Sequence, residues 1–255
     1  MGRDFEQKVF LVAGASGGIG LVISRLLLER GARVALHYRS NARQLEELAQ
    51  KFGADKAILV RANLTVREEV ETMVSQVVSR FEQLNGFLCT VGTALRMKPF
   101  LDTPEELIDQ TIAIELRSVI TGVRAVLPHL VAAGGGRIVL VGSDSGKVGT
   151  TGESVSAACR GGIIAFAKSI AREYARSKVL ANVVCPGPTD TGLWNDLVTT
   201  DEFSGKVGNA MIRSTALRRL AAPEEVAATA VFLASPEASF ITGQAISVSG
   251  GLTMC

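Results

Sequence analysis

Residues 8–20 read KVFLVAGASGGIG, in which a short apolar run leads into a turn rich in glycine. Glycine has no side chain to keep a ligand away from the backbone, and the first N–H groups of a helix bind anions well. The glycines at 14, 18 and 20 therefore predict a strand, a phosphate-binding turn and a helix, in that order. We expect the residues of this turn to contact a dinucleotide, namely Gly14, Ser16, Gly18, Ile19 and Gly20.

The alternation of short apolar runs with longer helical patterns continues along the whole chain. This order is typical of parallel βαβ units, and continuously apolar strands are expected where helices cover both faces of a sheet. The sequence predicts the α/β class, as one Rossmann-type, doubly wound domain over 1–255 with a seven-stranded parallel sheet and helices on both faces. The predicted strands are 8–14, 33–38, 57–62, 86–91, 136–143, 179–186 and 244–249. The predicted helices are 19–32, 41–52, 66–83, 104–132, 153–176 and 223–234.

Residues 187–222 form a long stretch with no clear strand and only a weak helical pattern. Connections of this length in compact domains are usually binding loops or lids. We expect this stretch to be a loop insertion on the substrate side.

The composition argues against several classes of protein. The 255 residues include 27 Lys and Arg against 25 Asp and Glu, a net charge of +2 without the basic footprint of a nucleic-acid binder. No apolar stretch approaches the roughly 20 residues that span a bilayer, and no signal peptide is recognisable, so we expect a cytoplasmic protein without membrane contact. The four cysteines, at 89, 159, 185 and 255, are scattered, which predicts reduced, mostly buried thiols and no metal site.

The end of the second predicted strand, LHYRSN at 36–41, bears on the choice of cofactor. An acidic residue here would bond the ribose of NAD, whereas an arginine suits the 2′-phosphate of NADP. Tyr38 stands where the acid is expected and Arg39 follows, which favours NADP over NAD; alternatively, Arg39 is only a solvated surface residue. Asn63, in ANLT after the third strand, is expected at the adenine edge, and His37 and His129 are expected to have structural roles.

Three further blocks carry a family resemblance: GESVSAACRGGIIAFAKSIARE at 152–173, NVVCPGPTDT at 182–191 and FITGQAISVSGGLTM at 240–254. With them, the chain resembles a classical short-chain dehydrogenase/reductase over essentially its full length. The blocks are most similar to dehydrogenases of hydroxyacyl-CoA thioesters in aromatic and alicyclic acid degradation, such as 2-hydroxycyclohexanecarboxyl-CoA dehydrogenase. The resemblance implies NAD or NADP as cofactor and a dimer or tetramer. It implies further cofactor contacts from Leu64, Gly92, Pro186, Gly187, Thr189 and Thr191.

The resemblance also implies a catalytic tetrad of Asn, Ser, Tyr and Lys, of which only the serine is kept, as Ser143. Ser156 stands in place of the tyrosine, Arg160 in place of the lysine and Glu115 in place of the asparagine, while residues 89–92 read CTVG where the family has NNAG. A serine hydroxyl is far less acidic than a phenol and needs a separate base, and arginine does not lose its proton. We therefore expect these tetrad positions to be inactive.

The leading interpretation is a non-catalytic subunit, a pseudoenzyme, in a hetero-oligomer with a catalytically intact paralogue, such as a tetramer. By resemblance, the assembly would be an NAD-dependent hydroxyacyl-CoA dehydrogenase of aromatic-compound degradation, including that of toluene. The cofactor could then be bound only in the partner, and an acyl-CoA would be the substrate of the complex. The alternatives are an active NADP-dependent reductase, a non-redox enzyme built on Ser143 with Glu115 as acid or base, and a nucleotide-sensing module. Glu115 could instead pair with Arg160 and do no catalysis.

Overall fold

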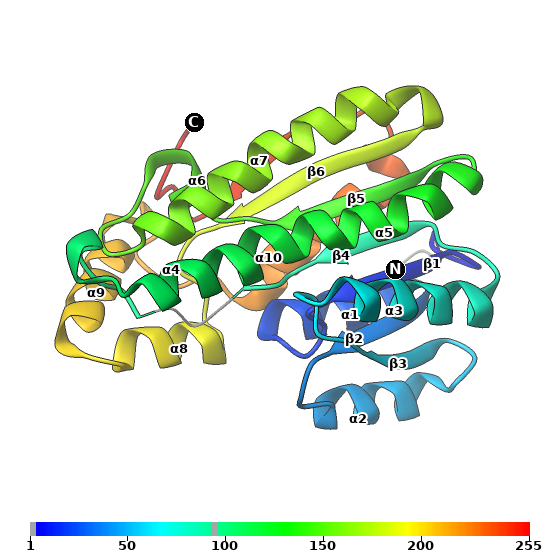
Figure 1. The fold of residues 1–255 in the computed structure, drawn as a ribbon, viewed down its shortest axis with the longest axis horizontal. Helices are drawn as coiled ribbons and strands as arrows, with labels where there is room; N and C mark the ends of the chain where they lie inside the picture. Colours follow the sequence, from blue (N-terminus) through cyan, green and yellow to red (C-terminus); the bar gives the residue numbers. More distant parts are fainter. Residues whose placement is uncertain (1–3, 93–95) are drawn as a thin grey trace.

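The computed structural model describes residues 4–92 and 96–255, which form one seven-stranded parallel sheet in the order β3-β2-β1-β4-β5-β6-β7 (Figure 1). This confirms the fold predicted from the sequence. The strands are β1 (Val9–Ala13), β2 (Arg33–Tyr38), β3 (Ala57–Arg61), β4 (Gly86–Cys89), β5 (Gly136–Val141), β6 (Val179–Pro186) and β7 (Ala245–Val248).

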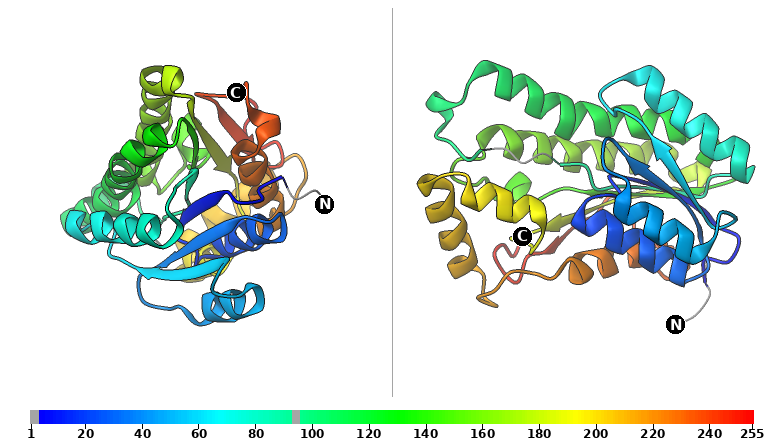
Figure 2. Two further views of the ribbon diagram at one scale, coloured as in Figure 1. Left: turned by 90° about the vertical axis from the view of Figure 1, so that its right-hand side faces the viewer. Right: turned by 90° about the horizontal axis from the view of Figure 1, so that it is seen from below.

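Helices cover both faces of the sheet, as the two further views show (Figure 2). One buried cluster joins the sheet to α3, α5 and α7, and a second joins it to α1, α2 and α10. The α-helices are α1 (Gly18–Glu29), α2 (Arg43–Phe52), α3 (Arg67–Phe81), α4 (Glu105–Thr111), α5 (Ser118–Ala132), α6 (Ser145–Val148), α7 (Ser154–Tyr174), α8 (Gly192–Thr199), α9 (Glu202–Ser214) and α10 (Pro223–Ala234). Short 3₁₀ turns occur at Phe100–Asp102, Ala175–Ser177 and Pro236–Ala238.

Strand β1 shows why its sequence is apolar throughout. Val9 and Leu11 belong to one buried cluster, whereas Phe10 and Val12 belong to the other. Successive side chains of a strand point to opposite faces, so a strand covered on both faces has no polar side. Strand β1 also pairs with β2 on one side and β4 on the other, which makes its carboxyl end the point where the strand order reverses. Ligands of open α/β sheets bind at this point.

Residues 187–222 differ from the prediction, because they contain α8 and α9 rather than a loop. Both helices begin at a side-chain cap: Thr191 accepts from the N–H of Trp194 at 3.2 Å, and Asp201 accepts from the N–H of Ser204 at 2.8 Å. Predicted helix 104–132 is also more complex, since a π-helical segment, η2 (Ile112–Arg117), separates α4 from α5. Within the described ranges, no helix has the length and apolarity needed to cross a membrane.

Candidate active site

A cavity of about 420 Å³ lies at the carboxyl ends of β1 to β4, and the glycine-rich turn forms one of its walls. Gly14 has a φ of +80°, a conformation that favours glycine. A Cβ on Gly20 would lie 2.2 Å from the carbonyl oxygen of Gly14, and one on Gly18 would lie 2.9 Å from Thr191 Cγ2. The turn therefore keeps the close backbone packing that a phosphate-binding turn requires.

The residues predicted to bind the cofactor gather around this cavity and a second one beside it. All of them line one or both cavities except Tyr38, which is half-buried and packs against the core. Arg39 is exposed at the rim of the first cavity, close to Asn63 in the lining. The residues present thus fit the adenosine and pyrophosphate end of a dinucleotide.

His37 lies in the wall of the first cavity, where sequence reasoning placed only a structural residue. Its Nδ1 accepts from the N–H of Gly14 at 2.9 Å, and its Nε2 lies 3.0 Å from the carbonyl oxygen of Ala62. Burial lowers the pKa of His37. The ring is therefore neutral with its proton on Nε2, and it ties the glycine-rich turn to the end of β3.

The second cavity, of about 170 Å³, shares Ile19, Thr90, Gly92 and Thr191 with the first. It contains all the positions that correspond to the expected catalytic groups. They are Glu115, Ser143, Ser156 and Arg160. The structure thus brings together residues that lie up to 45 positions apart in the sequence.

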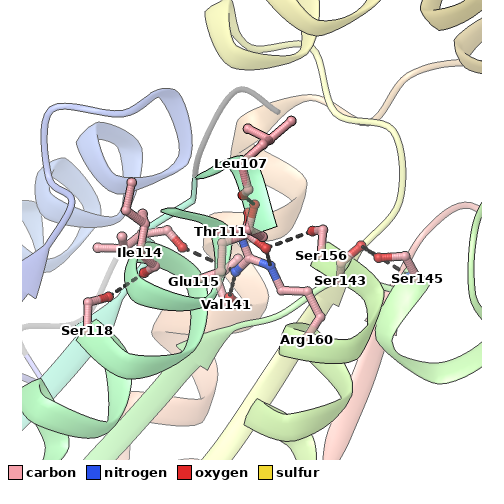
Figure 3. Close-up of polar contacts among 11 residues, drawn as sticks. Leu107, Thr111, Ile114, Glu115, Ser118, Val141, Ser143, Ser145, Ser156 and Arg160 are labelled. Carbon is pink, nitrogen blue, oxygen red and sulfur yellow. Dashed lines mark hydrogen bonds and ion pairs between the residues drawn. The ribbon is translucent and has the colours of Figure 1, made fainter. Parts of the chain in front are cut away.

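Three of these positions, Glu115, Ser156 and Arg160, are bonded to one another rather than open to a substrate (Figure 3). Arg160 Nη2 lies 2.9 Å from Glu115 Oε1, and Arg160 Nε donates to Glu115 Oε2 at 3.1 Å. Ser156 Oγ donates to the same Oε2 at 2.7 Å. Glu115 is 2% exposed and Arg160 8%, so this is a buried ion pair. The pairing of Glu115 with Arg160 that the sequence suggested is present, so Glu115 is not an unpaired carboxyl group.

The remaining nitrogen of the Arg160 guanidinium is also occupied. Nη1 donates to the carbonyl oxygens of Val91, at 3.2 Å, and Val141, at 3.0 Å. A Cβ on Gly92 would lie only 2.9 Å from Nη2, so the guanidinium lies against the backbone that follows β4. Arg160 therefore binds protein atoms at the position where the family lysine would hold the cofactor.

Ser143 is the one tetrad position that remains available. Its Oγ accepts from Ser145 Oγ at 2.9 Å and from the Ser145 N–H at 3.2 Å. This leaves its own hydroxyl proton free to donate into the cavity. Ser143 can polarise a carbonyl, but it has no base in hydrogen-bonding contact among the described residues.

Glu115 is held by a π-helical turn, a form often found at functional sites. Side-chain hydroxyls bond to the helix backbone on both sides of it: Thr111 Oγ1 donates to the carbonyl of Leu107 at 2.5 Å, and Ser118 Oγ donates to that of Ile114 (Figure 3). The changed segment after β4 is likewise structural, since Thr90 Oγ1 donates to the carbonyl of Gly14 at 3.0 Å.

Sequence reasoning missed Glu153, which also lines the second cavity. Burial, together with the nearby charge of Glu115, raises the pKa of Glu153 to about 7, while Arg160 acts in the opposite direction. No hydrogen bond or ion pair joins its carboxyl group to any residue within 4–92 or 96–255. The sequence did offer one indication that Glu153 belongs to the site. Glu153 stands three residues before Ser156, and this spacing brings two side chains to the same side at the start of a helix.

The thiols carry no chemistry here. Cys89, Cys159 and Cys185 are buried, as predicted, whereas Cys255 is exposed. Burial raises the pKa of Cys89 and of Cys185 to about 11, which keeps both protonated. No group of three His, Cys, Asp or Glu side chains suited to a metal ion occurs in the part of the chain that the structure describes.

Comparison with known proteins agrees with this architecture. Residues 14–253 match the family described as enoyl-(acyl carrier protein) reductase. The chain belongs to the short-chain dehydrogenase/reductase family. It is 33% identical over 253 residues to cis-4-hydroxycyclohexanecarboxylate dehydrogenase of Sinomonas cyclohexanicum, covering 99% of both chains. It is also 33% identical to the 3-oxoacyl-[acyl-carrier-protein] reductase FabG of Vibrio cholerae and to nodulation protein G of a Rhizobium species, in each case over 98% of this chain and 99% of the relative.

Short-chain dehydrogenases/reductases use NAD or NADP, and the first cavity has the walls that such a cofactor needs. This member of the family differs at the catalytic end of the cleft. There, Ser156 and Arg160 stand at the positions of the acid/base pair, and both are bonded to the buried Glu115.

Proposed function

We propose that this short-chain dehydrogenase/reductase is the non-catalytic subunit of a hetero-oligomeric, NAD-dependent hydroxyacyl-CoA dehydrogenase of aromatic-compound degradation. The observation that carries the proposal is the buried contact of Glu115 with both Arg160 and Ser156. A hydride transfer to or from a carbonyl needs a group that exchanges a proton with the substrate oxygen. The groups at these positions exchange hydrogen bonds with each other instead.

The family resemblance of the sequence supports the reaction that we assign to the complex. The chain is similar to hydroxyacyl-CoA dehydrogenases, and its degenerate tetrad resembles the inactive subunit of the heteromeric 2-[hydroxy(phenyl)methyl]succinyl-CoA dehydrogenase of anaerobic toluene degradation. A relative named for an alicyclic hydroxy acid is in keeping with this class of substrate. On this proposal, a catalytically intact paralogue binds the NAD and the acyl-CoA.

Two features support association with such a partner. Apolar side chains are exposed along the helix that runs from η2 into α5, with Ile112 41% and Ile120 38% exposed. Strand β7 is an edge of the sheet, and family members associate through this region and through the long helices. A paralogue with related surfaces could use the same pseudo-twofold contacts.

The test is purification of the untagged chain from its native host, followed by mass analysis of the proteins that co-elute. We expect a short-chain dehydrogenase with intact tyrosine and lysine, and dehydrogenase activity only in the complex. Purified alone, the chain should not turn over β-hydroxyacyl-CoA with NAD or NADP. Steady turnover by the homomeric protein that Ser143→Ala abolishes would refute the proposal.

A second candidate function has one observation in its favour. Ser143 and Glu153 line the same cavity, and Glu153 has no protein partner among the described residues, so it could exchange a proton with a ligand. This combination would suit an NADP-dependent reductase or a non-redox enzyme with an atypical site. Turnover that both Ser143→Ala and Glu153→Gln abolish would favour this function.

A further inference from the structure

The carboxyl group of Glu153 is a half-buried acid that the proposed function does not use. It lies in the wall of the second cavity, and nothing in the described parts of the chain donates a hydrogen bond to it. Burying a carboxylate without a partner is costly, so such a group either takes up a proton or meets a cation. The surroundings of Glu153 decide between these outcomes.

The other charged groups that line the cavity are already bonded. Glu115 is paired with Arg160, and Asp144 accepts from Ser247 Oγ at 2.6 Å and from the hydroxyl of Thr253. Lys147 Nζ donates to the same Ser247 Oγ at 2.8 Å, so Asp144 also has a cation nearby. Among the described lining residues, Glu153 is then the carboxyl group without a bonded partner, and Arg160 carries the one guanidinium. The nitrogens of that guanidinium all contact Glu115 or backbone carbonyls, so it offers nothing to an anionic ligand. The cavity is therefore electrostatically suited to a cation.

The other side chains in the wall of the second cavity are suited to contact an apolar part of a ligand. Trp194, Leu197, Met211 and Leu252 line the cavity, and α8 supplies the first two of them. The face of an indole ring attracts ammonium groups. A dry cavity of about 150 Å³ is known to take up benzene, so the cavity of about 170 Å³ has room for a six-carbon ring with a short arm.

We propose that the second cavity binds a small primary ammonium compound with an apolar body of about the size of a six-carbon ring. Glu153 is the anionic partner of the ammonium group, and Trp194 and its apolar neighbours contact the body. Binding of the ammonium compound requires no turnover and no partner subunit, so this inference can be tested separately from the proposed function.

The test uses the single tryptophan of the chain, Trp194, as a reporter inside the proposed site. Cyclohexylmethylamine is titrated into the full-length protein at pH 8, where the Glu153 carboxylate prevails, and binding is followed by tryptophan fluorescence and by calorimetry. Cyclohexylmethanol and cyclohexanecarboxylate are titrated as neutral and anionic probes of the same shape. We expect saturable binding of the amine, and affinities at least about tenfold weaker for both other probes, because only the amine forms a charge-assisted hydrogen bond with a carboxylate.

Glu153→Gln should weaken amine binding about tenfold or more and leave the alcohol unaffected. Glu202→Gln is the matched control: it removes the same charge from an exposed side chain that pairs with Lys206 and does not line the cavity, so amine affinity should not change. Circular dichroism would check that both variants are folded. The inference is overturned if calorimetry detects no amine binding, if the alcohol or the carboxylate binds as well as the amine, or if Glu153→Gln binds the amine like the wild type.

Discussion

Replacing Glu153 by glutamine should stabilise the protein at high pH and not at low pH. The pKa of this carboxyl group rises from 4.5 to about 7 on folding, a difference of about 2.5 units. At about 1.4 kcal/mol for each unit, ionisation would cost the folded state at most about 3.5 kcal/mol. The cavity is open to solvent on one side, which reduces this ceiling, so we expect about 1–3 kcal/mol.

The sign follows from which state binds the proton more tightly. Between pH 4.5 and about 7 the folded protein holds a proton on Glu153 that the unfolded chain releases, so stability falls as the pH rises through this window. Glutamine resembles the protonated acid in shape and carries no charge at any pH. Glu153→Gln should therefore match the wild type near pH 5 and exceed it by about 1–3 kcal/mol at pH 8.

The assay is urea denaturation of both proteins at pH 5, 6, 7 and 8, without added ligand. The difference between wild type and variant cancels the contributions of other titrating groups. Glu202→Gln, an exposed change, should show no such difference. If the difference in unfolding free energy between wild type and Glu153→Gln is the same at pH 5 and pH 8, Glu153 is not desolvated as the structure indicates, and the reasoning fails.

Four further changes test other parts of the site. Glu115→Gln should cost about 3–5 kcal/mol in urea denaturation, because it leaves Arg160 buried without its counter-charge; a cost below 1 kcal/mol would contradict this. His37 has a lowered pKa, so its contribution to stability should be present above pH 6.5 and be lost as the pH falls below it; His37→Gln should lose this pH dependence in the same assay. Calorimetry should show NADP binding more tightly than NAD, and Arg39→Gln should abolish the preference; equal loss for both cofactors would show that Arg39 does not meet the 2′-phosphate. Ser156→Tyr with Arg160→Lys should give no rapid dehydrogenase in a spectrophotometric assay, since Glu115 remains.

The sequence predicted the sheet because its evidence was local and repeated. Every strand is a short apolar run, and burial on both faces explains why the runs do not alternate. The two helices between 187 and 222 were missed for the opposite reason. Helix α8 has only eight residues and none of them is buried, and in α9 only Ser204 and Gly208 are buried. The caps at Thr191 and Asp201 were the local signals that marked where the two helices begin.

The sequence predicted those features of the candidate site that follow from residues that differ from the family. It did not predict features that depend on how the surrounding side chains pack. Glu115 and Arg160 have opposite charges at positions expected to be close, so their pairing could be anticipated before the structure. The environment of Glu153 could not be anticipated, because a sequence does not show whether a glutamate is solvated or lies without a partner in the wall of a cavity. Its raised pKa arises from desolvation and from the charge of Glu115, and both depend on the packing of α7 against the turn at η2.

The three changed tetrad positions depend on one another structurally, because their side chains share one set of buried hydrogen bonds. An arginine at 160 needs more space and more acceptors than a lysine, and a serine at 156 leaves that space where a tyrosine would fill it. Glu115 supplies the counter-charge, and its second bond comes from the hydroxyl of Ser156. Restoring asparagine at 115 would leave Arg160 without its counter-charge, and restoring tyrosine at 156 would fill the space beside the guanidinium, each at a cost in stability. Since two of the three single reversions carry such a cost, the ion pair itself opposes a stepwise return to the residues of the family.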